Sequence, residues 1–253
     1  MNSPGAFFDL YGTLLLYGDM NAAWSDWLTA LYKSLQGQGV AGDRQWLAEH
    51  CDGFFSRPEP PIEPDGLTVY ERRIGRLCRD IRLEVSKTDL SQAAQVSIEA
   101  WHQYISLDPN SIPLLSQLSN NRILALISNF DYPPQVYVML SKFGLDKFFD
   151  VVVISGEVGI SKPDPGIFDL ALQRTDADPV DTVYVGDTLN DVSGALASGL
   201  RPILIDRPSD PRTDEATEFR INREAGETNA AMLARNMGAI VVRSLAEVAT
   251  VLT

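Results

Sequence analysis

The chain has 253 residues, of which 45% are hydrophobic and 22% are charged, a balance that is ordinary for a globular protein. Its formal net charge of −13 disfavours nucleic acid as a partner, because binding to a phosphate backbone needs a basic surface. No stretch approaches ~18 apolar residues, and the chain does not open with a basic region followed by an apolar segment, so we expect a cytoplasmic protein with no membrane partner.

The predicted elements begin with a short buried strand at residues 6–9, which ends on Asp9. A long region follows in which apolar residues recur at helical spacing. This spacing predicts helices at 22–35, 44–55, 68–81 and 90–105, interrupted by a proline-rich loop at 57–65. His50 and His102 stand alone within these helices, and we interpret both as surface or packing residues.

From residue 121 onward, strands and helices alternate. The predicted strands lie at 123–127, 151–154, 182–185 and 202–205, and the helices between them lie at 135–143, 167–172 and 192–197. Alternation of this kind predicts a parallel sheet covered by helices on both faces. We therefore predict an α/β fold, a doubly wound parallel sheet built from residues 1–17 and 107–253, with an α-helical cap domain inserted at 18–106.

The tail of the chain is less regular. Residues 206–238 are polar and acidic, and we interpret them as a surface excursion with one helix at 228–237; an active-site flap and an oligomer contact are the alternatives. A strand at 239–242 and a helix at 245–252 follow. We expect a monomer or a homodimer.

Polar residues follow the predicted strands at one edge of the sheet. Asp9 ends the first strand, Ser128 and Asn129 follow the second, and Asp187 follows a later strand at a glycine turn. Ligands of open α/β sheets bind beyond the carboxyl ends of the strands. We therefore expect these side chains to meet at one site, beneath the helical insert.

Two further segments complete the pattern. Lys162 lies in the sequence GISKPDP at 159–165, and Asp191 ends the sequence GDTLND at 186–191. With Asp9 and Ser128, these segments stand in the order of the four motifs of the haloacid dehalogenase-like hydrolase superfamily, which the chain resembles from residue 7 to about residue 205. The resemblance implies a doubly wound α/β core, and the position of the insert resembles the helical cap of that superfamily (C1 type).

The resemblance also implies a reaction. Asp9 would attack the phosphorus atom of a small phosphorylated metabolite and form an aspartyl-phosphate that water hydrolyses. A Mg²⁺ ion would be held by Asp9, Asp187 and the main-chain carbonyl of Tyr11, with Asp191 reaching the ion through water or orienting Lys162.

The other implied roles concern the substrate. Lys162 would neutralise the charge of the nucleophile and of the phosphoryl oxygens, and the Ser128 hydroxyl would bind a non-bridging oxygen. The predicted catalytic residues are thus Asp9, Lys162 and Ser128. The predicted substrate contacts are Tyr11, Thr13, Ser128, Asn129 and Lys162.

Tyr11 departs from the phosphatase pattern. Phosphatases of the superfamily usually carry an aspartate there, which protonates the leaving group and activates water. A tyrosine, with a pKa near ~10, is a poor general base at neutral pH. The sequence Asp-x-Tyr-Gly-Thr at 9–13 instead looks like that of the 2-haloacid dehalogenases, in which the aspartate attacks carbon and displaces halide without a metal.

The fourth motif separates these two interpretations. The dehalogenases typically carry Ser-Ser-Asn-x-x-Asp there, whereas this chain has GDTLND, which keeps the metal-binding acid Asp187. The tyrosine that the dehalogenases carry six residues after the lysine is Phe168 here. We therefore predict a Mg²⁺-dependent phosphatase. The alternatives are a 2-haloacid dehalogenase and a catalytically impaired binding protein on the same fold.

Overall fold

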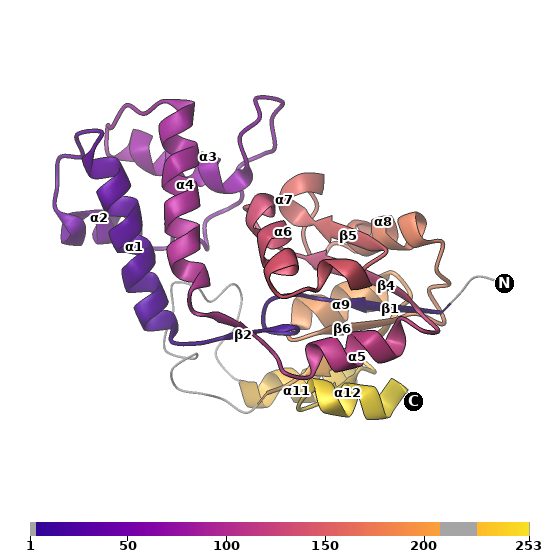
Figure 1. Ribbon diagram of the computed structural model, residues 1–253. Helices are drawn as coiled ribbons and strands as arrows, with labels where there is room; N and C mark the ends of the chain where they lie inside the picture. Colours follow the sequence, from indigo (N-terminus) through magenta and orange to yellow (C-terminus); the bar gives the residue numbers. More distant parts are fainter. Residues whose placement is uncertain (1–3, 208–226, 253) are drawn as a thin grey trace.

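The computed structural model describes residues 4–207 and 227–252 and contains a six-stranded parallel sheet (Figure 1). The strand order is β5-β4-β1-β6-β7-β8. The strands are β1 (Gly5–Phe8), β4 (Ile123–Ser128), β5 (Val151–Ile154), β6 (Val183–Gly186), β7 (Arg201–Ile205) and β8 (Ile240–Val242). The predicted α/β class with a doubly wound parallel sheet is confirmed.

Strand β1 lies at the centre of the sheet, and all four of its residues are buried. Phe7 is in register with Ala125 of β4 on one side and with Tyr184 of β6 on the other. A strand that is covered on both faces reads as a continuous apolar run, which is why the sequence predicted it. Asp9, the next residue, is therefore delivered to the carboxyl edge between β4 and β6.

Helices cover both faces of the sheet. Buried side chains of α5 (Ser111–Leu118), α6 (Pro133–Lys142) and α12 (Leu245–Leu252) pack with Ala6 and Phe8 on one face. On the other face, α8 (Pro165–Thr175) and α9 (Leu189–Ala197) pack against Phe7. The other core helices within the described residues are α7 (Ser155–Val158), the 3-10 helix η1 (Asp146–Phe148) and α11 (Glu227–Asn236).

The inserted helices form a second layer beside the carboxyl edge of the sheet, at the left of Figure 1. They are α1 (Met20–Gln36), α2 (Arg44–His50), α3 (Val69–Asp80) and α4 (Lys87–His102). Capping boxes at Thr68 and Ser86 satisfy the first N–H groups of α3 and α4, which fixes where these helices begin. We call α1–α4 and the loops between them the cap.

Two short strands connect the cap to the core, and the sequence analysis missed both. Strands β2 (Leu15–Tyr17) and β3 (Ile105–Leu107) form an antiparallel pair. Three residues are too few to show the alternation that predicts a strand. Our domain boundaries at 17/18 and 106/107 fall at this pair, and the division itself stays a prediction.

Two cap helices end three or more residues earlier than predicted. The second cap helix ends at His50 rather than at residue 55. A turn follows His50, in which Gly53 has φ +64°. The fourth ends at His102, because Ile105 pairs with Tyr17 in the connecting strands. The helix predicted at 228–237 corresponds to α11, and α5 was not predicted. Most of the predicted surface excursion, residues 208–226, lies outside the described residues.

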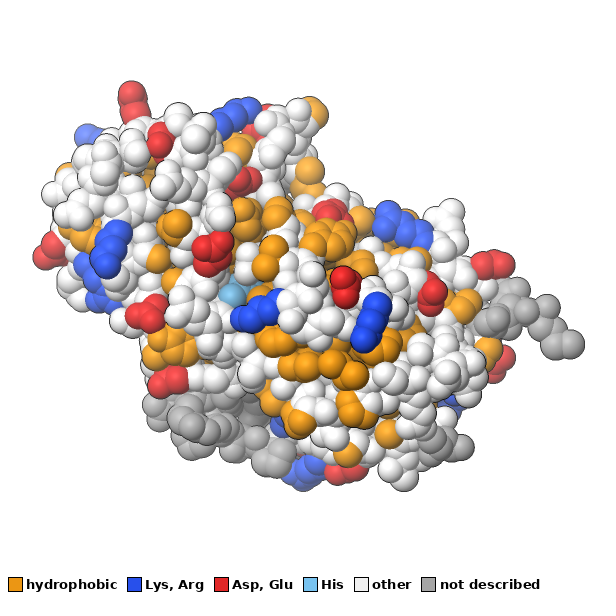
Figure 2. Space-filling model, in the orientation of Figure 1, with side chains coloured by type: hydrophobic (Ala, Val, Ile, Leu, Met, Phe, Trp, Pro, Cys, Tyr) orange, Lys and Arg blue, Asp and Glu red, His pale blue; other side chains and the backbone are white. Residues whose placement is uncertain are grey.

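The surface seen in Figure 2 carries charges of both signs, spread among uncharged groups. Hydrophobic side chains gather over the core near α6, where Tyr137 and Val138 are exposed. Within the ranges 4–207 and 227–252, no helix combines the length and the apolar character needed to cross a bilayer.

Candidate active site

A buried lysine joins two carboxylates at the carboxyl edge of the sheet. The Lys162 Nζ atom donates to Asp9 Oδ1 at 2.6 Å and to Asp191 Oδ1 at 2.7 Å. It also lies 3.0 Å from the hydroxyl of Tyr184, which donates to Asp191 Oδ1 at 3.0 Å. Asp9 and Lys162 are each 6% exposed, and Asp191 is 1% exposed. Three residues that the sequence separated widely thus form one hydrogen-bonded group.

Local structure holds this group in place. Asp191 is the fourth residue of a capping box, and its Oδ2 atom accepts from the backbone N–H and the hydroxyl of Thr188. A side chain at Gly186 would overlap the Asp191 carboxylate, so the turn after β6 needs glycine there. Asn129 and Lys162 exchange two hydrogen bonds, from Asn129 Nδ2 to Lys162 O and from Lys162 N to Asn129 Oδ1. Asn129 therefore ties the lysine loop to the end of β4.

Burial and charge act in opposite directions in this group. Burial raises the pKa of Asp9 to about 6, although the Lys162 charge opposes the rise. Burial also acts to raise the pKa of Asp191, but Lys162 and the Thr188 hydrogen bonds outweigh it and hold that pKa below its usual range. The two carboxylates in turn raise the pKa of Lys162 against the effect of burial. Asp191 is thus the permanent counter-ion of Lys162, and Asp9 is the more basic carboxylate.

A third carboxylate completes the predicted acidic cluster. Asp9, Asp187 and Asp191 each offer one oxygen, and these oxygens lie within 4.8 Å of one another. Gly12 has φ +84°, and a Cβ at that position would overlap the Asp187 carboxylate, so glycine allows the loop after β1 to approach Asp187 closely. Carboxylate oxygens are the ligands that hard divalent cations prefer. The three residues therefore fit a bound cation.

Two predicted substrate contacts have hydroxyl groups whose hydrogen bonds are unmade within the described part of the chain. Ser128 is 1% exposed at the end of β4, and its Oγ atom has no hydrogen-bond partner among residues 4–207 and 227–252. Thr13 is fully buried, and its Oγ1 atom also has no hydrogen-bond partner among these residues. Because a buried hydroxyl without a partner is costly, an incoming acceptor at Ser128 would recover that cost. The assignments of both residues to substrate binding stay predictions.

Tyr11 has a partner that the sequence analysis did not foresee. Its hydroxyl lies 2.7 Å from Nε2 of His102, and its ring stacks on Phe130 with centroids 4.7 Å apart. The Nδ1 atom of His102 lies 2.8 Å from the carbonyl oxygen of Ile98, which only accepts, so Nδ1 carries the proton. The neutral imidazole then accepts at Nε2, and Tyr11 donates to it. His102, which we predicted to be a packing or surface residue, is buried at the end of α4 and joins the cap to the loop after β1.

We expect this buried imidazole to make stability depend on pH. Burial lowers the pKa of His102 to about 4, so the unfolded chain takes up the proton first and stability is lost as pH falls below about 6.5. Between pH 7 and pH 5 this group should remove on the order of 2 kcal/mol from the free energy of unfolding. Urea unfolding of the wild type and of His102→Gln at both pH values measures it. An equal pH dependence in the two proteins would contradict the assignment.

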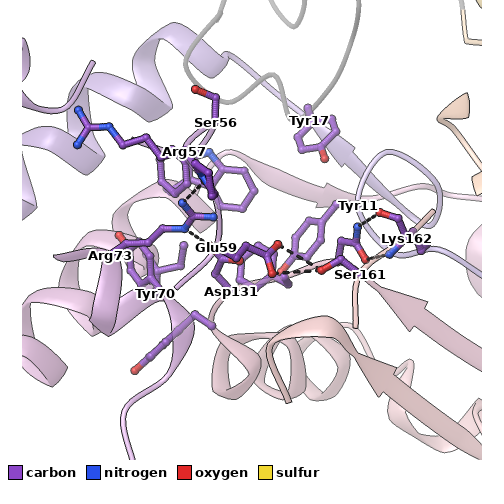
Figure 3. Close-up of a pocket in the computed structure, with 17 residues that line it drawn as sticks. Tyr11, Tyr17, Ser56, Arg57, Glu59, Tyr70, Arg73, Asp131, Ser161 and Lys162 are labelled. Atoms are coloured by element: carbon purple, nitrogen blue, oxygen red, sulfur yellow. Dashed lines mark hydrogen bonds and ion pairs between the residues drawn. The ribbon is translucent and has the colours of Figure 1, made fainter. Parts of the chain in front are cut away.

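A cavity of about 420 Å³ lies between the cap and the core, and Tyr11, Asn129 and Lys162 line it on the core side (Figure 3). Many of its other walls are aromatic. The aromatic lining residues are Tyr11, Tyr17, Phe55, Tyr70, Trp101, Phe130 and Tyr132. In Figure 3, Tyr11 and Lys162 lie at one end of the cavity, and Arg73 and Tyr70 lie at the other.

Polar contacts between cap and core close the sides of this cavity. Arg73 of α3 is 7% exposed and forms an ion pair with Asp131, which follows β4 in the core. The backbone N–H of Tyr70 donates to the Asp131 carbonyl at 3.0 Å. The Ser161 hydroxyl donates to Glu59 Oε2 at 3.1 Å. Sequence reasoning missed these contacts because each joins residues of different elements with no shared periodicity.

The comparisons with known proteins agree with this geometry. A family model described as haloacid dehalogenase-like hydrolase matches residues 4–199, and one described as HAD-hydrolase-like matches residues 159–248. The chain belongs to the haloacid dehalogenase-like hydrolase family. The first match spans the residues of the acidic cluster and Lys162.

Relatives of this HAD-family chain include phosphatases. The chain is 30% identical over 230 residues to ribulose-1,5-bisphosphate 5-phosphatase of Halopiger xanaduensis, covering 88% of this chain and 93% of that protein. It is 33% identical over 137 residues to glyceraldehyde 3-phosphate phosphatase of Methanopyrus kandleri, covering 50% of this chain but only 59% of that relative. A solved HAD phosphatase from Thermococcus onnurineus covers 98% of this chain with a TM-score of 0.64 and 22% identity, which shows the shared fold.

Proposed function

We propose that this HAD-family hydrolase is a Mg²⁺-dependent phosphatase that acts on a small phosphorylated metabolite. One observation carries the proposal: Asp187 brings a third carboxylate to Asp9 and Asp191 beside the buried Lys162. An anionic nucleophile that attacks an anionic phosphate ester needs compensating positive charge. Displacement of halide from carbon needs no such acidic cluster. The two relatives named as phosphatases support the same choice.

The proposed reaction has two displacements at phosphorus. An Asp9 carboxylate oxygen attacks the phosphorus atom, the bond from phosphorus to the ester oxygen breaks, and that oxygen takes the electron pair and a proton from solvent water to leave as an alcohol. A water molecule then attacks the aspartyl-phosphate and gives a proton to solvent, the bond from phosphorus to the carboxylate oxygen breaks, and inorganic phosphate leaves while Asp9 is restored as a carboxylate. With a pKa of about 6, Asp9 is mainly ionised at neutral pH, as a nucleophile must be.

Each neighbouring residue has a part in these steps. Lys162 holds the attacking carboxylate and offsets its charge, while Asp191 keeps the lysine charged and oriented. The Ser128 hydroxyl donates to a non-bridging phosphoryl oxygen, which would satisfy its buried Oγ atom. Asp9, Asp187 and the main-chain carbonyl of Tyr11 would hold the Mg²⁺ ion, and Asp191, whose oxygens already accept from Lys162 and Thr188, would reach the ion through water. When bound, that ion supplies positive charge to the phosphoryl oxygens.

Phosphate release from propyl phosphate and chloride release from 2-chloropropionate, each with Mg²⁺ and with EDTA, test the proposal. We expect phosphate release with Mg²⁺, a fall of about 100-fold or more with EDTA, and recovery when Mg²⁺ is restored. Chloride release in EDTA would instead establish the dehalogenase that the Tyr11 sequence suggests. The absence of turnover in all four combinations of substrate and condition would count against both enzymatic interpretations and favour the binding-protein alternative.

A further inference from the structure

Aromatic residues outnumber charged residues in the lining of the cavity beside Lys162. Its aromatic side chains come from both sides: Phe55 and Tyr70 belong to the cap, and Tyr11 and Phe130 belong to the core. Phe55 and Tyr70 lie nearly parallel, with an angle of 10° between their planes and 6.2 Å between centroids. Tyr11 and Phe130 are also stacked, at 19°. In each pair the phenylalanine is the more exposed ring: Phe55 and Phe130 are half-buried, whereas Tyr70 is 1% exposed and Tyr11 is 7% exposed. Aromatic side chains of the cap and of the core therefore both line the space that a ligand would enter.

The phenol hydroxyls at the two ends of the cavity are already engaged. Tyr11 donates to His102, as described above. The Tyr70 hydroxyl accepts from Trp27 Nε1 at 2.5 Å and lies 2.7 Å from the hydroxyl of Ser97. These oxygens are thus held by neighbours rather than offered to a polyhydroxyl ligand. These two tyrosines therefore contribute aromatic ring atoms, rather than free hydroxyl groups, to the cavity wall.

The arginines of the lining are engaged as well. Arg73 is paired with Asp131, and its Nη1 atom donates to the backbone carbonyls of Phe54 and Arg57 at 3.3 and 2.7 Å. The Arg57 guanidinium donates to backbone carbonyls within the cap and lies 3.7 Å from Asp80. The other charged side chains of the lining, apart from Lys162, are the acids Glu59 and Asp131. A second phosphate on the substrate would meet these acids and no unpaired arginine within the described lining.

We propose that this site takes a phosphate monoester whose uncharged organic part carries an aromatic ring, bound against the stacked rings of the cavity. The inference rests on the proposed phosphatase function and names the class of its substrate. The phosphate group would lie at the Lys162 end, next to Asp9, and the ring would lie towards Tyr70. Ring-to-ring contacts add attraction beyond the burial of apolar area, and they favour a planar group over a saturated one.

Three primary alkyl phosphates with equivalent leaving groups test the proposal, because their rates then differ through binding rather than through bond breaking. They are 2-phenylethyl phosphate, 2-cyclohexylethyl phosphate and propyl phosphate. We expect kcat/KM for the phenyl ester to exceed that of propyl phosphate by about 10-fold or more, and to exceed that of the cyclohexyl ester. Equal values for the phenyl and propyl esters would overturn the proposal, and so would a cyclohexyl ester at least as good as the phenyl ester.

A variant tests whether the preference for the phenyl ester over the propyl ester arises in this cavity. Phe55→Leu keeps an apolar side chain but removes one ring of the cap pair, and it should reduce the phenyl-to-propyl ratio of kcat/KM several-fold. Tyr137→Leu is the matched control, because Tyr137 is an exposed aromatic residue of α6 outside the cavity lining, and its ratio should equal that of the wild type. An unchanged ratio in Phe55→Leu would overturn the assignment to this cavity.

Different results would contradict the phosphatase function and the aromatic substrate class. If all three esters are hydrolysed at equal kcat/KM with Mg²⁺, the phosphatase function stands and the aromatic substrate class is wrong. If none of them releases phosphate under conditions in which chloride is released from 2-chloropropionate, the phosphatase function itself is wrong and the substrate class falls with it.

Discussion

Replacement of Asp9 by asparagine is expected to lower the turnover of phosphate esters by a factor of about 10⁴ or more, because the amide keeps the shape of the carboxylate but is not a nucleophile. The same variant should form no phosphoryl-enzyme. Phosphate release in the steady state measures the first effect. Intact mass of the protein, quenched in acid during turnover, measures the second.

The fold should survive this change, which makes the result interpretable. Asp9 is buried and its pKa is raised, so a neutral group at this position avoids the cost of burying a charge. Lys162 also retains Asp191 as its counter-ion. Asp169→Asn, which removes an exposed carboxylate on α8, is the matched control and should keep full activity. Activity of Asp9→Asn equal to that of the control would contradict both the phosphatase and the dehalogenase interpretations.

Replacement of Lys162 by methionine is expected to have a large effect on both activity and stability. The Nζ atom contacts Asp9 and Asp191, so its removal leaves two buried carboxylates without their cation. Breaking a buried ion pair in this way costs on the order of 3–5 kcal/mol in the free energy of unfolding. We expect kcat to fall by a factor of about 10³ or more, since Asp9 would be protonated at neutral pH.

The loss of stability in Lys162→Met has a specific pH dependence. In the folded variant Asp9 holds a proton that the unfolded chain releases at neutral pH, so lowering the pH reduces the free-energy cost of taking up that proton and should narrow the difference in stability from the wild type. Urea unfolding at pH 7.5 and pH 5.5 measures this change. Lys142→Met, in which an exposed lysine of α6 is removed, is the control and should unfold like the wild type. A difference in stability that is the same at both pH values would show that packing, rather than charge, is lost in Lys162→Met, and a difference that widens at low pH would contradict the argument from charge.

Much of the core could be predicted because its signals are local. The strand at 151–154 was predicted with its observed bounds, since four apolar residues there stand between Asp150 and Ser155. The acidic cluster was predictable for a similar reason. Asp9 and Asp187 each follow a buried strand, and parallel strands bring their carboxyl ends to one edge.

The contacts of the cap could not be predicted in this way. Tyr11 and His102 are 91 residues apart, and nothing in the spacing of apolar residues says that the end of α4 lies over the loop after β1. The pairing of Arg73 with Asp131 likewise depends on how the cap lies against the core. Docking between two layers is decided by the shape and polarity of whole surfaces, and a single sequence without homologues carries no periodic signal for it.

The central position of β1 determines when, during folding, the pKa of Asp9 is raised. The backbone N–H of Asp9 donates to Val185 O at 2.9 Å, and Asp9 meets Lys162 across a sequence separation of 153 residues. Such long-range pairing closes slowly, since the entropy of a large loop must be overcome first. During synthesis Asp9 therefore leaves the ribosome as an ordinary solvated carboxylate. Its unusual basicity arises only when β6 and α9 have been made and docked beside it.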